Sequence, residues 1–125
     1  MSHTLLVLDD DPNVLTLLGT YFGGLGWRVE TCAEAEEALK LADSDVPFDA
    51  VICDLHFTAA HLGEGYEILS RARRHRPRAA VLLFTGAPAE KVLEEALRHG
   101  ADEVITKPAP LARLRDAALR AMGKP

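Results

Sequence analysis

Three consecutive aspartates, Asp9, Asp10 and Asp11, follow the apolar run Leu5–Leu8. Carboxylates that crowd one point raise each other's pKa unless a cation joins them, and a hard divalent cation prefers such oxygen ligands. The motif therefore suggests a metal site, although a solvated acidic turn in which Asp11 caps the next helix explains it as well. The aspartates alone do not separate these two interpretations.

Asp54, Thr85 and Lys107 are the other residues whose types suit phosphate chemistry; Asp54 and Thr85 directly follow apolar runs, and Lys107 follows the last predicted strand. An aspartate beside a bound cation can act as a nucleophile toward phosphorus, as in enzymes that form aspartyl phosphates. Lysine offers a compact positive charge, and threonine offers a hydroxyl that can bond a phosphoryl oxygen. Taken singly, each also has an ordinary explanation: a loop acid, a surface lysine and a helix-capping threonine.

Short apolar runs alternate along the chain with segments in which apolar residues recur at helical spacing. The predicted strands are Thr4–Leu8, Arg28–Thr31, Ala50–Cys53, Ala80–Phe84 and Glu103–Thr106. Strands that alternate with helices form a parallel sheet with helices on both faces, which is a three-layer α/β architecture. Because ligands bind such sheets at the carboxyl ends of the strands, the aspartates, Asp54, Thr85 and Lys107 are expected to meet at one edge.

Helix ends are also marked in the sequence. Asp11 followed by Pro12 predicts the start of the first helix, and Pro88 is a candidate first residue of the fourth. Gly100 follows two basic residues, which is typical of a helix that ends at a glycine. The connection over residues 54–64 is long for a loop between a strand and a helix, and long loops in compact domains often carry function.

The chain has 125 residues, of which 48% are hydrophobic and 26% charged, and its net charge is −5. This composition is that of an ordinary globular protein, and the length predicts one domain over residues 1–125. A negative net charge does not favour general binding to nucleic acid or anionic membranes. No apolar stretch approaches the roughly 20 residues that span a bilayer, and the N-terminus lacks the pattern of a signal peptide.

The two cysteines, Cys32 and Cys53, do not have the spacing of a metal site. Both are expected to be small buried residues of a protein from a reducing compartment. Together with the absence of a signal peptide pattern, this predicts a cytoplasmic protein.

Four segments together resemble the receiver domain of bacterial two-component response regulators, over nearly the whole chain. The segments that carry the resemblance are 5–12, 50–55, 83–86 and 99–108. The resemblance implies a flavodoxin-like (βα)5 fold with strand order 2-1-3-4-5 and a cis peptide bond between Lys107 and Pro108. In that order the strands of Cys32 and Cys53 lie two spacings apart, roughly 9–10 Å, so no disulfide is expected.

The resemblance also implies a role for each residue of the site. Asp54 would accept a phosphoryl group from a histidine kinase or a phosphotransfer protein, and Thr85 and Lys107 would contact that group. The implied cofactor is Mg²⁺, for which Mn²⁺ could substitute. Its protein ligands would be Asp10 directly, Asp9 through a water, Asp54 and the backbone carbonyl of His56. Such a domain is a signalling module and not an enzyme, apart from its own phosphorylation and dephosphorylation at Asp54.

Three features depart from the family pattern or add to it. Val104 stands where the family usually has an aromatic residue that swings inward on phosphorylation, and the short, stiff side chain of valine cannot make that movement. The loop after Asp54 is longer than usual and contains His56 and His61, which either line the site or bind metal or, as is more usual, are ordinary polar loop residues. The basic segment Arg71–Arg78 is either a solvated helix end or a docking surface for an acidic partner or nucleic acid.

A receiver domain would signal through a partner protein or a second copy, without contacting nucleic acid or membrane directly. The expected surface comprises the fourth helix, the fifth strand and the fifth helix. Its charged residues, which can pair across an interface, are Arg98, Asp102, Glu103, Arg113, Arg115 and Asp116.

Two other functions fit part of the pattern. Asp9 and Asp11 resemble the first motif of haloacid dehalogenase-like phosphatases, and Thr85 and Lys107 resemble later motifs. That alternative makes Asp9 the nucleophile but leaves Asp54 without a role. A docking domain that works without phosphorylation and keeps only a relict site is the third hypothesis.

Overall fold

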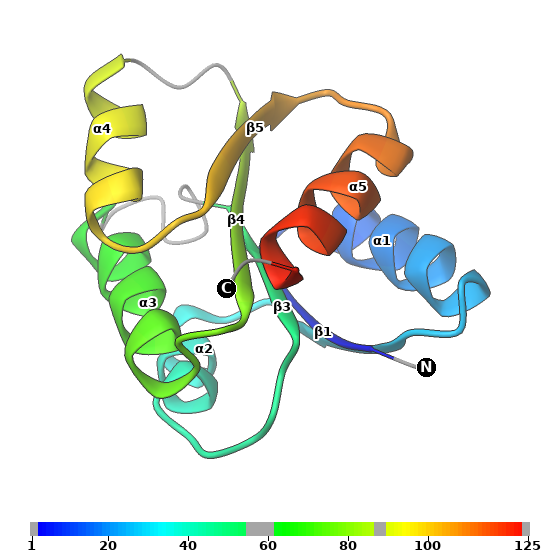
Figure 1. The fold of residues 1–125 in the computed structure, drawn as a ribbon, viewed down its shortest axis with the longest axis horizontal. Coiled ribbons are helices and arrows are strands. Elements are labelled where there is room, and N and C mark those ends of the chain that lie inside the picture. Colours follow the sequence, from blue (N-terminus) through cyan, green and yellow to red (C-terminus); the bar gives the residue numbers. More distant parts are fainter. Residues whose placement is uncertain (1–2, 55–61, 87–89, 124–125) are drawn as a thin grey trace.

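The computed structural model describes residues 3–54, 62–86 and 90–123, in which strands and helices alternate (Figure 1). The elements are β1 (Thr4–Leu8), α1 (Pro12–Gly24), β2 (Arg28–Cys32), α2 (Ala35–Ala42), β3 (Ala50–Cys53), α3 (Leu62–His75), β4 (Ala80–Gly86), α4 (Glu90–Arg98), β5 (Glu103–Lys107) and α5 (Leu111–Met122). All strand pairs are parallel, and the strand order is β2-β1-β3-β4-β5, as predicted. Within the described residues, no helix has both the length and the apolar character of a membrane span.

Helices cover both faces of the sheet. Figure 1 shows α1 and α5 on one side of the strands and α2, α3 and α4 on the other. Successive residues of a strand point to opposite faces, so Leu5 and Val7 belong to one hydrophobic cluster and Leu6 and Leu8 to the other. Because both faces are covered, the central strands β1, β3 and β4 are near-continuous apolar runs rather than alternating ones.

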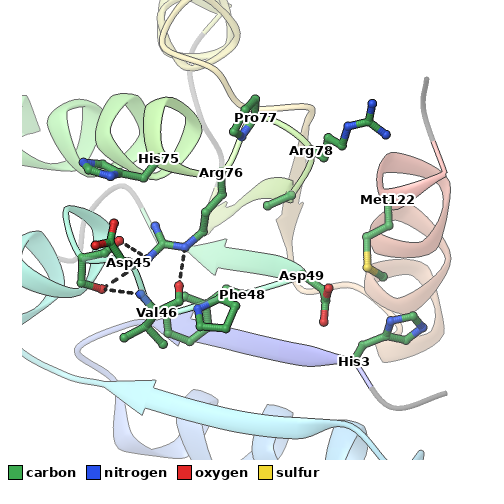
Figure 2. Close-up of a pocket in the computed structure, with 13 residues that line it drawn as sticks. His3, Asp45, Val46, Phe48, Asp49, His75, Arg76, Pro77, Arg78 and Met122 are labelled. Atoms are coloured by element: carbon green, nitrogen blue, oxygen red, sulfur yellow. Dashed lines mark hydrogen bonds between the residues drawn. The ribbon is translucent and has the colours of Figure 1, made fainter.

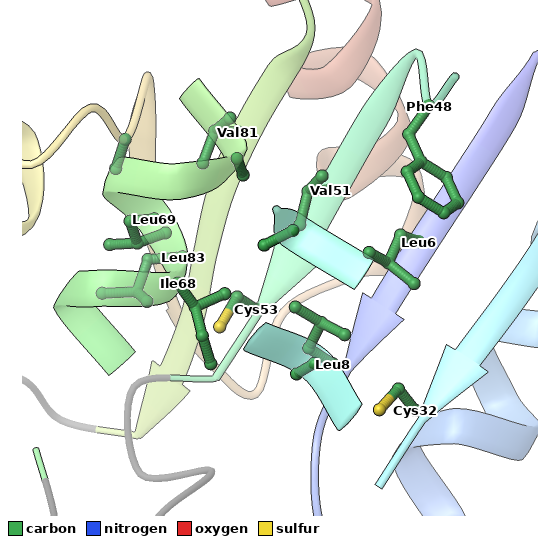
Figure 3. Close-up of a cluster of buried hydrophobic side chains, with 14 of the residues drawn as sticks. Leu6, Leu8, Cys32, Phe48, Val51, Cys53, Ile68, Leu69, Val81 and Leu83 are labelled. Atoms are coloured by element: carbon green, nitrogen blue, oxygen red, sulfur yellow. The ribbon is translucent and has the colours of Figure 1, made fainter. Parts of the chain in front are cut away.

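The cluster under α2 and α3 is drawn in Figure 3. Leu6, Val51 and Val81, from three neighbouring strands, pack there with Ile68 and Leu69 of α3, and all five side chains are buried. Burying a side chain of this size contributes roughly 1.5–3 kcal/mol, so the cluster stabilises α3 against the sheet far more than helix propensity could.

Cys32 and Cys53 lie in the same cluster, and both are free thiols (Figure 3). Burial raises the pKa of each thiol above its ordinary value. Both cysteines therefore stay neutral and behave as small apolar residues, as the sequence predicts.

The predicted helix ends are observed at α1 and α4. Asp11 caps α1 by accepting a hydrogen bond from the backbone N–H of Asn13 at 2.9 Å, and Pro12 is the first helical residue. Gly100 follows α4 with φ +109°, and a Cβ atom on it would lie 2.9 Å from the Cβ of Arg73. Only glycine fits at that position. Pro88 lies outside the described residues.

Three strands run further than predicted. The most important difference is in β4, which includes Thr85 and Gly86, and these pair with Thr106 and Lys107 of β5. The prediction that Thr85 follows the strand is therefore wrong. The polar Thr-Gly pair suggested a strand end, but the backbone pairing with β5 continues through both residues.

Two arginines of the basic segment Arg71–Arg78, Arg73 and Arg76, bond other parts of the chain, whereas Arg74 and Arg78 are exposed. Arg76 is only 9% exposed and lies at a surface cavity of about 660 Å³, where it points toward the loop between α2 and β3 (Figure 2). Its guanidinium donates hydrogen bonds to the carbonyl oxygens of Leu41, Ala42, Ser44 and Val46, at 3.1, 2.9, 2.8 and 2.7 Å. These carbonyls include the last two of α2, which have no partner within a helix.

Arg73 makes a second set of internal bonds, to the residues just before β4 and between α4 and β5. Its guanidinium bonds Asp102 at 2.7 Å, and Asp102 also accepts the N–H of Val81. The same guanidinium donates to the carbonyl oxygens of Pro77, Ala79 and Gly100. Arg73 and Arg76 thus tie the end of α3 to its neighbours on both sides.

Candidate functional site

The carboxylates of Asp9, Asp10 and Asp54 meet at one edge of the sheet. Asp9 directly follows β1 and Asp54 directly follows β3, and the last residues of these neighbouring strands, Leu8 and Cys53, pair with each other. One oxygen from each of the three aspartates lies within 4.8 Å of the other two. Asp9 and Asp54 are 2% and 8% exposed, whereas Asp10 is exposed.

This donor set fits a hard divalent cation. Mg²⁺ takes oxygen ligands and is usually bound by one or two carboxylates together with several waters, so these three carboxylates could hold it directly or through water. Two of the three are buried, where an unneutralised charge is costly. His56, whose carbonyl is the fourth ligand implied by the resemblance, lies outside the described residues, as does His61.

Lys107 supplies a positive charge to the same edge. Its ammonium donates to Asp9 Oδ2 at 2.7 Å and to Asp54 Oδ2 at 3.1 Å. The residue ends β5, which lies two strands from β3, so its side chain reaches across β4 to meet Asp54. The cis peptide bond between Lys107 and Pro108, implied by the resemblance, is present.

Thr85 lies in β4, between the strands that present Asp54 and Lys107, and is fully buried. Among the described residues, its hydroxyl has no hydrogen-bond partner. A buried hydroxyl without a partner costs about 1–3 kcal/mol, so this position is unfavourable unless another group bonds it. An anionic oxygen placed near Asp54 would be such a group.

Burial and ion pairing oppose each other at this site. Burial raises the pKa of Asp9 above its ordinary value, and hydrogen bonds from Lys107 and the Asp11 amide offset this only in part. Burial lowers the pKa of Lys107, but its hydrogen bonds to Asp9 and Asp54 outweigh that effect and leave the pKa raised. Lys107 therefore stays charged at neutral pH, and its charge does not fully neutralise the carboxylates.

The raised pKa of Asp9 predicts a pH dependence. A folded-state pKa above the unfolded one means that the folded protein binds the proton more tightly. The resulting stability is fully present below about pH 4 and is lost as the pH rises through the folded pKa. We therefore compare the free energy of unfolding of the metal-free wild type with that of Asp9→Asn. The wild-type value minus the variant value should decrease as the pH rises from about 4. Urea unfolding of both proteins across pH 4–7 measures it, and a difference that rises with pH would contradict the expectation.

A small apolar groove adjoins Lys107 on the α1 side of the sheet. It has a volume of about 190 Å³ and is lined by Val14, Leu17, Leu18, Phe84, Lys107, Pro108, Ala109 and Leu111. The Lys107 ammonium lies 5.3 Å from the centroid of the Phe84 ring, within cation–π range. The sequence indicated Phe84 only as an apolar strand residue, because its relation to Lys107 depends on the register of β4 and β5.

Val104 is half-buried and packs against the cluster under α2 and α3, on the face of the sheet opposite Phe84. It occupies the position at which the resemblance implies a mobile aromatic residue. Among the described residues, the ring of Phe84, which adjoins Lys107, comes from β4 and lies on the other face of the sheet.

The family model of the response regulator receiver domain matches residues 5–119. A curated relative is the alkaline phosphatase synthesis transcriptional regulatory protein PhoP of Bacillus subtilis, which is 33% identical over 110 residues. The match covers 86% of this chain and 43% of PhoP, so the chain spans less than half the length of that relative.

Solved structures agree with this match. A response regulator from Burkholderia pseudomallei, with a phosphorylated aspartic acid, calcium ion and citrate, has a TM-score of 0.83 and 27% identity, covering 93% of this chain and 66% of that one. The receiver domain of sensor histidine kinase PA1611 from Pseudomonas aeruginosa PAO1, with a magnesium ion in its active site cleft, has the same fold: its TM-score is 0.81 at 22% identity, covering 99% and 100%.

These matches do not support the phosphatase alternative, in which Asp9 is the nucleophile. The geometry is also against it, because Asp9 Oδ1 accepts the N–H of Asp11 and Oδ2 accepts the Lys107 ammonium. The family match over most of the chain, the 2-1-3-4-5 sheet and the acidic site at its edge agree with one another. The chain therefore belongs to the receiver domain family of two-component response regulators, signalling domains that are phosphorylated on an aspartate.

Proposed function

We propose that Asp54 accepts a phosphoryl group from a histidine kinase or phosphotransfer protein, in a reaction that depends on Mg²⁺ and switches contacts with a partner. The observation that carries the proposal is the contact of Lys107 with both Asp9 and Asp54 beside Asp10, at one edge of the sheet. That edge combines a nucleophile, a cation site and a fixed positive charge, which phosphoryl transfer requires.

Each residue has a role in this reaction. A carboxylate oxygen of Asp54 attacks phosphorus, an O–P bond forms, and the bond from phosphorus to the donor breaks with its electron pair left on the donor. Lys107, already 3.1 Å from Asp54, would pair with a phosphoryl oxygen, and the unpartnered Thr85 hydroxyl would donate to another. Asp9 and Asp10 would hold Mg²⁺ with Asp54, and the ion, for which Mn²⁺ could substitute, would neutralise the phosphoryl charge.

The test is labelling with a small phosphodonor. The protein is incubated with acetyl phosphate, with Mg²⁺ or with a chelator, and its intact mass is followed. We expect one phosphoryl group in the presence of Mg²⁺ only, and borohydride reduction followed by peptide mapping should place it on Asp54. A stable adduct on Asp9 would revive the phosphatase alternative, and a wild-type protein that takes up no phosphoryl group would contradict the proposal.

The Thr85 hydroxyl can be tested separately from the fold. Valine has the shape of threonine without the hydroxyl, and that hydroxyl has no partner among the described residues. We expect Thr85→Val to keep the free energy of unfolding unchanged or raise it by up to about 1 kcal/mol. The same variant should be phosphorylated about tenfold more slowly or worse, while Thr85→Ser stays close to wild type. Urea unfolding and the acetyl phosphate time course measure the two effects, and equal rates for valine and serine would contradict the role.

The partner surface differs from the expectation in one residue. Asp102 is committed internally to Arg73 and Val81, so it is not free to pair across an interface. The other charges of the α4-β5-α5 face form exposed pairs within the chain: Glu103 with Arg113 and Arg120, Arg98 with Glu95, and Arg115 with Asp116. Such pairs contribute only about 0–1 kcal/mol each, so a partner or second copy could exchange them at little cost.

Residues 1–125 would form a single receiver domain in the cytoplasm, where histidine kinases and phosphotransfer proteins present their phosphohistidine. The two buried free thiols agree with a reducing compartment. The domain would act through protein partners rather than by binding nucleic acid or membrane.

A further inference from the structure

Phe84 and Lys107 are neighbours on one face of the sheet. In the pairing of β4 with β5, Phe84 is opposite Ile105 and Gly86 is opposite Lys107. Residues two apart in a strand share a face, so Phe84 is the diagonal neighbour of Lys107. The ring is 7% exposed, and the ammonium lies 5.3 Å from its centroid. Two hydrogen bonds of the ammonium reach Asp9 and Asp54, and the ring flanks it as well.

We propose that Phe84 is a positioning residue for phosphorylation, which holds the Lys107 ammonium beside Asp54 through a cation–π contact. This inference rests on the proposed role of Asp54 and Lys107. The electron-rich face of the ring attracts the ammonium without taking any of its three N–H groups. The hydrogen bonds therefore stay free to pass from the carboxylates to a phosphoryl oxygen.

An aliphatic side chain at position 84 would not do the same. The Lys107 side chain is 23% exposed and borders the open groove, so it has room to swing toward water. Lysine is long and flexible, and holding it in one place costs conformational entropy. Leucine would still fill much of the apolar space, but it has no ring face to oppose that swing. Position 84 therefore affects the chemistry through the charge distribution of its side chain as well as its volume.

The test separates the charge distribution of the ring from its size. Phe84 is replaced by leucine, by tryptophan and, through a suppressor tRNA, by phenylalanine with increasing numbers of ring fluorines, which weaken the negative face at nearly constant shape. We expect the rate of Asp54 phosphorylation by acetyl phosphate to fall about threefold to tenfold for Phe84→Leu and to recover for Phe84→Trp. Along the fluorinated series the rate should decline step by step.

A matched control and an independent readout complete the design. Phe22 is fully buried in the same hydrophobic cluster and packs on Tyr21 and Trp27. Phe22→Leu should destabilise the fold without changing the phosphorylation rate of the folded protein. In the unphosphorylated protein, the ring current of Phe84 should shift the NMR signals of the Lys107 ε-methylene upfield, and Phe84→Leu should remove this shift.

The possible outcomes are distinct. Wild-type rates throughout the fluorinated series, or no ring-current shift on Lys107, would overturn the positioning role. A slow Phe84→Leu protein beside fast fluorinated ones would also overturn it, because size alone would then explain the effect. If the wild-type protein took up no phosphoryl group, the proposed function would fail, and the NMR shift would still decide whether the ring holds the ammonium.

Discussion

Replacing Asp54 with asparagine is expected to abolish phosphorylation by acetyl phosphate, a loss of at least about 100-fold in rate. The amide has nearly the shape of the carboxylate, but it carries no negative charge and is a far weaker nucleophile. Asp54 is 8% exposed and held beside Lys107, so no neighbouring acid takes its place without moving. Intact mass spectrometry of both proteins over the same time course measures the loss.

The matched control is Asp9→Asn. Asp9 is the more buried acid and bonds the same ammonium, so its replacement removes a comparable charge from the site. If Asp9 only helps to hold the cation, its variant should be slowed but still become phosphorylated at high Mg²⁺. Full labelling of Asp54→Asn would refute the assignment. Full kinase-independent signalling by an Asp54→Ala protein in the cell would instead favour a docking domain with a relict site.

Arg76→Met is expected to lower the free energy of unfolding by about 3 kcal/mol, since the guanidinium makes several hydrogen bonds to backbone carbonyls and bonds to charged groups contribute about 1.5–3 kcal/mol each. Methionine keeps much of the apolar length of the side chain but none of the donors. The carbonyls of Ala42, Ser44 and Val46 would lose the guanidinium together, whereas that of Leu41 would keep its bonds from Ser44. Urea unfolding followed by circular dichroism measures the change.

Arg78→Met is the control for charge, because Arg78 is an exposed arginine of the same segment. We expect it to change the free energy of unfolding by no more than about 0.5 kcal/mol. The phosphorylation rate of folded Arg76→Met should match that of the wild type, because Arg76 is not among the residues of the acidic site. Equal stability of the two methionine variants would show that the internal bonds of Arg76 contribute nothing.

The arrangement of the site could be predicted from the sequence because it depends only on where strands end. Parallel strands bring their carboxyl ends to one edge, so Asp9, Asp54 and Lys107 meet whatever the details of side-chain packing. The resemblance supplied the strand order, which apolar periodicity alone does not determine. Thr85 was predicted to follow β4 but lies within it. A polar pair near a strand end looks the same in the sequence whether or not the backbone pairing continues through it.

The arginines of α3 could not be predicted in the same way. Arg76 bonds carbonyls 30 to 35 residues earlier in the chain, and Arg73 bonds groups up to 29 residues away. A backbone carbonyl has no side-chain signature, so neither periodicity nor charge pattern reveals such partners. The contact of Phe84 with Lys107 was missed for a related reason. It depends on the register between β4 and β5, which cannot be predicted from the sequence pattern.

The bonds of Arg76 also have a consequence for the order in which the chain folds. Helix α2 has eight residues, and among the described residues its N-cap, Glu34, makes no side-chain capping bond. A helix this short is marginal by itself, and its last carbonyl, that of Ala42, is bonded by Arg76 only when the end of α3 arrives. On a ribosome, α2 would therefore remain a fluctuating turn until the chain has emerged past Arg76, and the two helices would form as one cooperative unit.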